Sequence, residues 1–216
     1  MGLHSRDMYA AMMHELKNNL GLLTMTLDAI PLRGEADHDR RLDNARLLCQ
    51  RSIERLQQAL LIYKAENREL HPVVDAYAPV DIVQELHDSA RSLARGRLVV
   101  QTRIDESVPQ LAFFDRSLVL MALTNAVHNS LTHARARVNI EVAWEEGFLV
   151  FSVRDDSAGY PAHILADGQS GGYTGNATGL GLKFARLIAE AHENRGRVGE
   201  LRLFNDNGAV FRLMLP

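Results

Sequence analysis

Apolar residues recur in alternating steps of four and three over the first third of the chain, which is the spacing of a heptad seam. In the first stretch they are Tyr9, Met13, Leu16, Leu20, Leu23, Leu27 and Ile30. In the second stretch the seam recurs every seven residues, at Leu42, Cys49, Leu56 and Tyr63. This spacing is typical of amphipathic helices that pack along one stripe. Pro31 and Gly34 separate the two stretches, so residues 6–67 are predicted to form an antiparallel helical hairpin.

The two seams need partners, because two helices alone bury little apolar surface. A second copy of the chain would supply them in a four-helix bundle, which predicts a homodimer. The alternative is that the hairpin packs on the second half of its own chain.

The period of the pattern changes after residue 68. Two prolines and no helical period mark residues 69–80 as a linker. Beyond it we expect helices at 80–94, 115–133 and 179–192, and strands at 97–104, 111–115, 136–144, 148–156, 197–204 and 209–215, with a hairpin turn at Glu146-Gly147. The predicted fold class is α+β, with a helical hairpin at residues 1–68 and one sheet carrying helices on one face at residues 81–216.

Composition excludes several classes of protein. The net charge of -3 provides no basic face for nucleic acid. Cys49 is the only cysteine, so an intrachain disulfide is impossible and a reducing, cytoplasmic location is favoured. No apolar run is long enough for a membrane segment, and the N-terminus lacks the apolar core of a signal peptide.

A polar set lies outside the first seam, where His14, Glu15 and Asn18 follow one another within little more than one helical turn. Imidazole titrates near neutral pH and has a nucleophilic nitrogen when it is unprotonated. Taken alone, the set favours a solvated helix face.

Three further signals follow in the second half. Asn125 and Asn129 lie four apart on one face of the predicted helix 115–133, and an amide oxygen can ligate Mg²⁺. Asp155 ends an apolar strand before a turn with Gly159, where a carboxylate can accept from the amine of adenine. The glycine-rich residues 171–181 precede a helix and can bring backbone N–H groups to phosphate. Taken one at a time, the asparagine pair is explained by a solvated helix face, Asp155 by a plain turn, and the glycine-rich residues by an ordinary loop.

The order and spacing of these signals together resemble the catalytic core of sensor histidine kinases, over nearly the whole chain. "HELKNNL" resembles the H box, "NAVHNSLTHA" the N box, "DDSAG" the first Gly box and "TGLGL" the second. The resemblance implies a dimerisation and phosphoacceptor hairpin followed by a Bergerat-type α/β sandwich that binds ATP and Mg²⁺.

The resemblance also implies roles for single residues. In the H box, His14 would be the phosphoacceptor, Glu15 would assist proton transfer, and Asn18 would place a water for dephosphorylation. The residues implied to bind the nucleotide are Asn125, Asn129, Asp155, Ser157, Gly159, Gly179 and Gly181. Among these, Asn129 would hold Mg²⁺, Asn125 would lie by the phosphates and Asp155 would contact adenine. A second alignment of the N box pairs Met121 with Asn125, but only the first preserves both amides.

Several positions depart from the family pattern. Asn19 replaces the usual proline of the H box, and Thr132 replaces a usual cation. Ser157 and Ala177 stand where the Gly boxes usually have glycine, and a Cβ there would crowd the nucleotide. Residues 162–182, the expected ATP lid, contain no Lys, Arg or Phe. Each departure predicts weaker use of ATP, because phosphoryl transfer depends on positioning and charge neutralisation.

Three functions remain open at this point. The first is a histidine kinase core that autophosphorylates His14 from ATP and passes phosphate to the receiver domain of a response regulator. The second is an ATP-independent histidine phosphotransferase of the same architecture, and the third a non-catalytic dimeric adaptor. In each case the sensor or input domain is expected on another chain or to have been removed.

Overall fold

The computed structural model describes residues 69–170 and 177–216, together with residues 15, 16, 18–23, 25, 26, 45, 48, 49, 52, 54 and 56–65. Two compact units divide the chain. One holds residues up to Glu69, and the other comprises Leu70–Thr174 and Thr178–Pro216. In the described part of the chain, no helix has both the length and the apolar character that crossing a membrane requires.

Every described residue between 15 and 65 is helical. The residues buried in the second of these helical stretches include Ala45, Ala59 and Ile62. By contrast, Leu56 and Tyr63 of the predicted seam are each 49% exposed, and Leu20 of the first seam is 47% exposed. These three seam residues are therefore about half exposed in the described part of the first unit. The predicted turn between the two helices lies outside the described residues.

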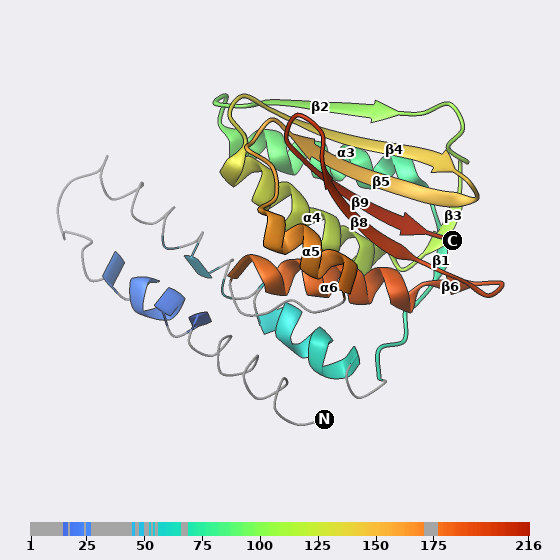
Figure 1. The fold of residues 1–216 in the computed structure, drawn as a ribbon, viewed down its shortest axis with the longest axis horizontal. Coiled ribbons are helices and arrows are strands. Elements are labelled where there is room, and N and C mark those ends of the chain that lie inside the picture. The colour runs from blue at the N-terminus through green and yellow to red at the C-terminus, as the bar shows by residue number, and fades with distance from the viewer. Residues whose placement is uncertain are drawn as a thin grey trace. The chain divides into compact units, whose positions relative to one another are not determined.

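The second unit contains a mixed five-stranded sheet, which confirms the predicted α+β class. The elements in chain order are β1 (Asp75–Tyr77), α3 (Pro79–Ala94), β2 (Val99–Ile104), β3 (Ala112–Phe114), α4 (Arg116–His133), β4 (Arg137–Glu145), β5 (Phe148–Asp155), α5 (Ala162–Ser170), α6 (Ala177–Ala191), β6 (Glu193–Asn194), β7 (Arg197–Val198), β8 (Glu200–Asn205) and β9 (Ala209–Leu215). The strand order is β2-β4-β5-β9-β8, in which only β2 and β4 run parallel. Helices α3 and α4 pack on one face of this sheet (Figure 1).

The core lies between the sheet and these helices. Alternate residues of the central strands point into it, among them Ile140, Val142, Phe151 and Val153, each at most 1% exposed. Phe114 meets Phe151 edge-on, with ring centroids 6.1 Å apart. The hairpin between β4 and β5 turns at Glu146 and Gly147 as predicted, and both have positive φ. This positive φ at both central residues is the geometry that two-residue hairpin turns prefer.

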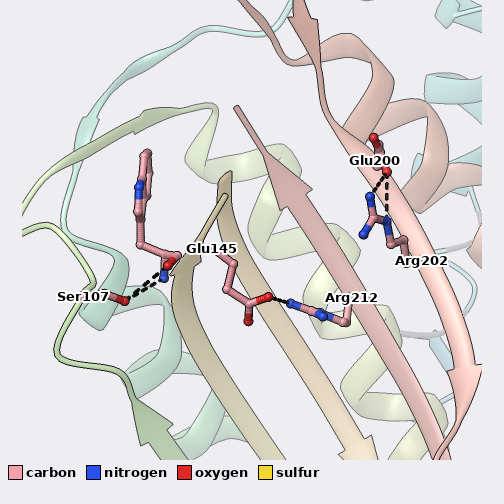
Figure 2. A network of polar contacts seen from close by, with 6 residues as sticks. Ser107, Glu145, Glu200, Arg202 and Arg212 are labelled. Carbon is pink, nitrogen blue, oxygen red and sulfur yellow. Dashed lines mark hydrogen bonds and ion pairs between the residues drawn. The ribbon is translucent and has the colours of Figure 1, made fainter. Parts of the chain in front are cut away.

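The opposite face of the sheet carries paired charges. Arg212 of β9 pairs with Glu145 of β4, and Arg202 of β8 pairs with Glu200 (Figure 2). Beneath them Phe148, Val150 and Met214 form a small buried cluster. The guanidinium of Arg197 lies 4.2 Å from the centroid of the Phe148 ring. These three cations are thus matched by carboxylates or by an aromatic face.

Two predicted segments are corrected by the structure. Residues 75–77, assigned to the linker, form β1 and pair with β3. Three residues are too few to show an alternating pattern. Within the expected lid, residues 162–170 form α5 and α6 begins at Ala177. Among residues 162–166 of α5 only Ile164 is buried.

Candidate functional site

A buried carboxylate at the end of β5 is the centre of the site. Asp155 is 9% exposed and accepts hydrogen bonds on both oxygens. Its Oδ2 accepts from the hydroxyl of Ser130 on α4 at 2.8 Å. Its Oδ1 accepts from the backbone N–H groups of Ser157 at 2.9 Å and Ala209 at 3.3 Å. The carboxylate is thus held by α4, by the following turn and by β9.

The turn after Asp155 is organised by its own side chains. The hydroxyl of Ser157 accepts from the N–H of Gly159 at 3.0 Å, so this side chain bonds within the turn. Gly159 has φ +87, a conformation that L side chains rarely adopt. Ser157, at a position where the resemblance implied glycine, thus stabilises the turn through its hydroxyl. Gly159 stands where the backbone requires glycine.

The two asparagines of α4 lie one turn apart, and both are partly buried. Asn125 lies directly against α6, because a Cβ built on Gly181 would be 2.4 Å from Nδ2 of Asn125. A glycine at 181 therefore lets α6 approach α4 at this level. Gly179 lies in the first turn of α6, where unpaired backbone N–H groups favour an anion.

The opposite ends of α4 and α6 are joined by a buried histidine. His192, 4% exposed, accepts the backbone N–H of Asp115 on Nε2 at 3.0 Å, while its Nδ1 lies 2.7 Å from the carbonyl of Ile188. This pairing requires the neutral ring with the proton on Nδ1. Burial lowers the pKa of His192, and the bond to Ile188 opposes that shift only in part. Asp115 in turn caps α4 by accepting from the N–H of Leu118 at 3.0 Å.

The loop after α4 is fixed by the neighbour of the central carboxylate. Asp156 accepts backbone N–H groups from Arg135 at 2.8 Å, Ala136 at 3.0 Å and Arg137 at 3.3 Å. The bond from Ala136, with those from Arg135 and Arg137, lowers the pKa of Asp156. The two adjacent aspartates therefore have different structural roles. Asp155 turns inward toward α4, and Asp156 holds the loop that joins α4 to β4.

The residues of the H box are only partly described. His14 and Lys17 lie outside the described residues. Glu15 and Asn18 are helical, Glu15 partly buried and Asn18 exposed. The two units are described separately, so the predicted roles of His14, Glu15 and Asn18 stay predictions.

The side chains in this region that could ligate a metal ion are the amides of two asparagines. Among the described residues, no group of three or more His, Cys, Asp or Glu side chains could hold one. Asn125 and Asn129 share a face of α4, and their oxygens are neutral hard donors of the kind Mg²⁺ accepts. Such donors suit an ion that receives most of its ligands from phosphate and water. The residues present therefore fit Mg²⁺ that arrives with a nucleotide.

Four residues of this region were missed by sequence reasoning. They are Ser130, Asn205, Asp115 and His192, and each forms a hydrogen bond with a residue 25 to 77 positions away in the chain. One signal was available for Asp115, because Asp just before a helix is a preferred N-cap. His192 ends the predicted helix 179–192, but nothing in the pattern identified its partner.

Comparison with known proteins agrees with this geometry. Residues 114–216 match the family described as Histidine kinase-, DNA gyrase B-, and HSP90-like ATPase. A probable sensor histidine kinase of Mycobacterium tuberculosis is 26% identical over 168 residues, which cover 74% of this chain and 42% of that protein. The chain thus spans less than half the length of this curated relative.

Solved structures of histidine kinases share the fold. The Acinetobacter baumannii histidine kinase AdeS aligns over 94% of this chain and 96% of its own, with a TM-score of 0.69 at 16% identity. The catalytic domain of histidine kinase ThkA aligns over 66% of this chain and 97% of its own, with a TM-score of 0.56 at 21% identity. Full-length ShkA in complex with AMPPNP aligns over 98% of this chain and 45% of its own, with a TM-score of 0.63 at 15% identity. Together with the family match over residues 114–216, these likenesses support a histidine kinase catalytic ATPase core in the second unit.

Proposed function

We propose that the chain is a two-component histidine kinase core that phosphorylates His14 from ATP and passes the phosphoryl group to an aspartate of a receiver domain. The observation that carries the proposal is the buried carboxylate of Asp155, held between β9 and α4, the helix that also carries the two asparagines. A histidine kinase-like ATPase domain in the same residues supports it.

The hydrogen-bond acceptor positions of Asp155 would favour adenine over guanine. Each carboxylate oxygen offers about two acceptor positions. In the described structure Oδ1 already accepts two backbone N–H groups, and Oδ2 accepts the hydroxyl of Ser130. Oδ2 therefore keeps one position for the exocyclic amine of adenine. The carbonyl oxygen that guanine carries at the same place would face this carboxylate oxygen and be repelled.

The residues that we assign to the phosphates lie on helices α4 and α6. We assign the amide oxygen of Asn129 to Mg²⁺ and place Asn125 beside the phosphates. When bound, the ion supplies neutralisation of phosphate charge. Gly179 in the first turn of α6 adds backbone N–H groups at a helix N-terminus, which favours anions. Gly181 allows Asn125 to keep its place against α6.

The transfer itself is assigned to the first unit. A neutral imidazole nitrogen of His14 attacks the γ-phosphorus, a nitrogen–phosphorus bond forms, the bond to the bridging oxygen breaks and ADP leaves. Glu15 is assigned to receive the proton that the ring then sheds. Asn18, which is exposed and helical, is assigned to a water that removes phosphate from the partner receiver.

We further assign a homodimer to the first unit. Leu20, Leu56 and Tyr63 are about half exposed although they occupy predicted seam positions. Large apolar side chains repeated along two helices are the surface that a four-helix bundle covers. This supports assembly through residues 6–67.

A second candidate, an ATP-independent histidine phosphotransferase, is favoured by one observation. Residues 162–182 contain no Lys or Arg, so this segment provides no cation to meet the phosphates of ATP. In that case His14 would exchange phosphate with receivers only. ATP binding separates the two candidates.

The test is incubation of the full chain with γ-labelled ATP and Mg²⁺, followed by assay for label that is acid-labile and base-stable. We expect label on the wild type and on His71→Gln, a control at an exposed histidine, and none on His14→Gln. Label that persists on His14→Gln would remove the phosphoacceptor assignment. Label only from a phosphorylated receiver would establish the phosphotransferase, and label from neither donor would favour a non-catalytic adaptor.

A further inference from the structure

The turn between β8 and β9 lies against both ends of the loop that follows Asp155. Asn205 and Ala209 are cross-strand partners at the base of this turn. Ala209 donates its backbone N–H to Oδ1 of Asp155, at the start of the loop. Asn205 bonds to the backbone of Tyr160, at its end. The β8–β9 turn therefore determines where the loop begins and where it ends.

The side chain of Asn205 forms the same pair of hydrogen bonds with the backbone of Tyr160 that a residue of a neighbouring antiparallel strand would form. The side-chain Oδ1 accepts the N–H of Tyr160 at 2.7 Å, and Nδ2 donates to the carbonyl of Tyr160 at 3.0 Å. An amide carries one acceptor and one donor in a single plane, as a peptide group does. Neither a carboxylate nor an aliphatic side chain can satisfy both groups of Tyr160.

The backbone on each side of these bonds is closely packed. A Cβ built on Gly159 would lie 2.6 Å from Cγ of Asn205, and one built on Gly208 would lie 1.8 Å from the carbonyl oxygen of Asp155. The loop and the β8–β9 turn are thus in contact at two points. Displacement of Asn205 would free the Gly159 end while the Asp155 end stays bonded to Ala209.

We propose that Asn205 is a positioning residue for nucleotide selection, which acts by holding residues 157–160 so that Asp155 presents Oδ2 to the base. This inference rests on the proposed function. The path is continuous: Asn205 holds Tyr160 and contacts Gly159, Gly159 donates to Ser157, and Ser157 donates to Asp155. Asn205 itself is exposed and has no assigned contact with the nucleotide.

The experiment is titration calorimetry of the full chain with ATP and with GTP, each in excess Mg²⁺. We expect the wild type to prefer ATP. Asn205→Ala should lose about tenfold in ATP affinity, the effect of one or two neutral hydrogen bonds, and much less in GTP affinity. Arg202→Gln, an exposed position on the same strand that pairs with Glu200, serves as the matched control and should bind both nucleotides as the wild type does.

A second variant protects the test against misfolding. Asn205→Asp keeps the size and the acceptor for Tyr160 N–H, but loses the donor and sets a carboxylate oxygen against the Tyr160 carbonyl. It should lower the ATP-to-GTP preference as Asn205→Ala does, with an unchanged circular dichroism spectrum. The cost of Gly159→Ala for ATP binding should also be smaller in the Asn205→Ala background, because its collision partner is gone.

The outcomes separate the two proposals. If the wild type binds neither nucleotide, the proposed function fails and this inference fails with it. If the wild type prefers ATP and both Asn205 variants keep the same ratio, the inference alone is overturned. An equal loss of ATP and GTP affinity accompanied by a lower melting temperature would show a purely structural role and overturn it as well.

Discussion

The hydroxyl of Ser130 offers the sharpest test of how the central carboxylate is held. Ser130→Ala removes a donor that is 6% exposed and lies 2.8 Å from Oδ2 of Asp155. The acceptor is a carboxylate, and hydrogen bonds to charged groups contribute about 1.5–3 kcal/mol. In the variant the buried Oδ2 of Asp155 loses this hydrogen-bond donor, so the folded state is destabilised relative to the unfolded state.

The expected magnitude is reduced slightly by helix propensity. Alanine is the better helix former by a few tenths of a kcal/mol, since Ser130 lies inside α4. The net loss should be about 2 kcal/mol, which corresponds to a roughly 30-fold smaller folding equilibrium constant. Thr132→Ala is the matched control on the same helix. Thr132 is exposed and its hydroxyl donates to the carbonyl of His128 in the preceding turn at 2.8 Å, so the change in its unfolding free energy should stay within about 0.5 kcal/mol.

The assay is urea unfolding of the full chain followed by tryptophan fluorescence. Trp144 is the single tryptophan and lies in β4, so the signal reports on the second unit. The midpoint of Ser130→Ala should fall with an unchanged slope, because the surface exposed on unfolding is the same. Equal midpoints for Ser130→Ala and Thr132→Ala would refute the view that Ser130 supports a buried charge.

Two further predictions concern the His192 contact and the helical unit. Burial lowers the pKa of His192, so its contribution to the unfolding free energy of the second unit should be fully present above the ordinary pKa near 6.5 and be lost as the pH drops below it. The same Trp144 assay in His192→Gln, which cannot titrate, should lack this component, and identical pH profiles would contradict the assignment. Leu20→Glu should turn the proposed dimer into a monomer in light scattering at micromolar concentration, because it places a charge in the bundle core. Gln57→Glu, at an exposed polar position, should leave the mass unchanged.

Local patterns in the sequence determined much of the second unit. The alternation of residues 136–144 and 148–156 identified β4 and β5, and Glu146-Gly147 identified their turn, because strand period and turn chemistry depend on neighbouring residues. The spacing of Asn125 and Asn129 placed both on one face of α4 for the same reason. The charged residues at the end of β5 were also evident, although their different roles were not.

Only the tertiary structure decided which groups meet. Ser130 and Asp155 are 25 residues apart, Asn205 and Tyr160 are 45 apart, and Asp115 and His192 are 77 apart. No period in the sequence links such pairs, since their approach depends on how β5, β8 and β9 pair and on how α4 and α6 pack. The same holds for Gly181, whose missing side chain matters only because Asn125 of another helix lies against it. Short-range periodicity therefore determined the elements, and the packing of those elements determined the site.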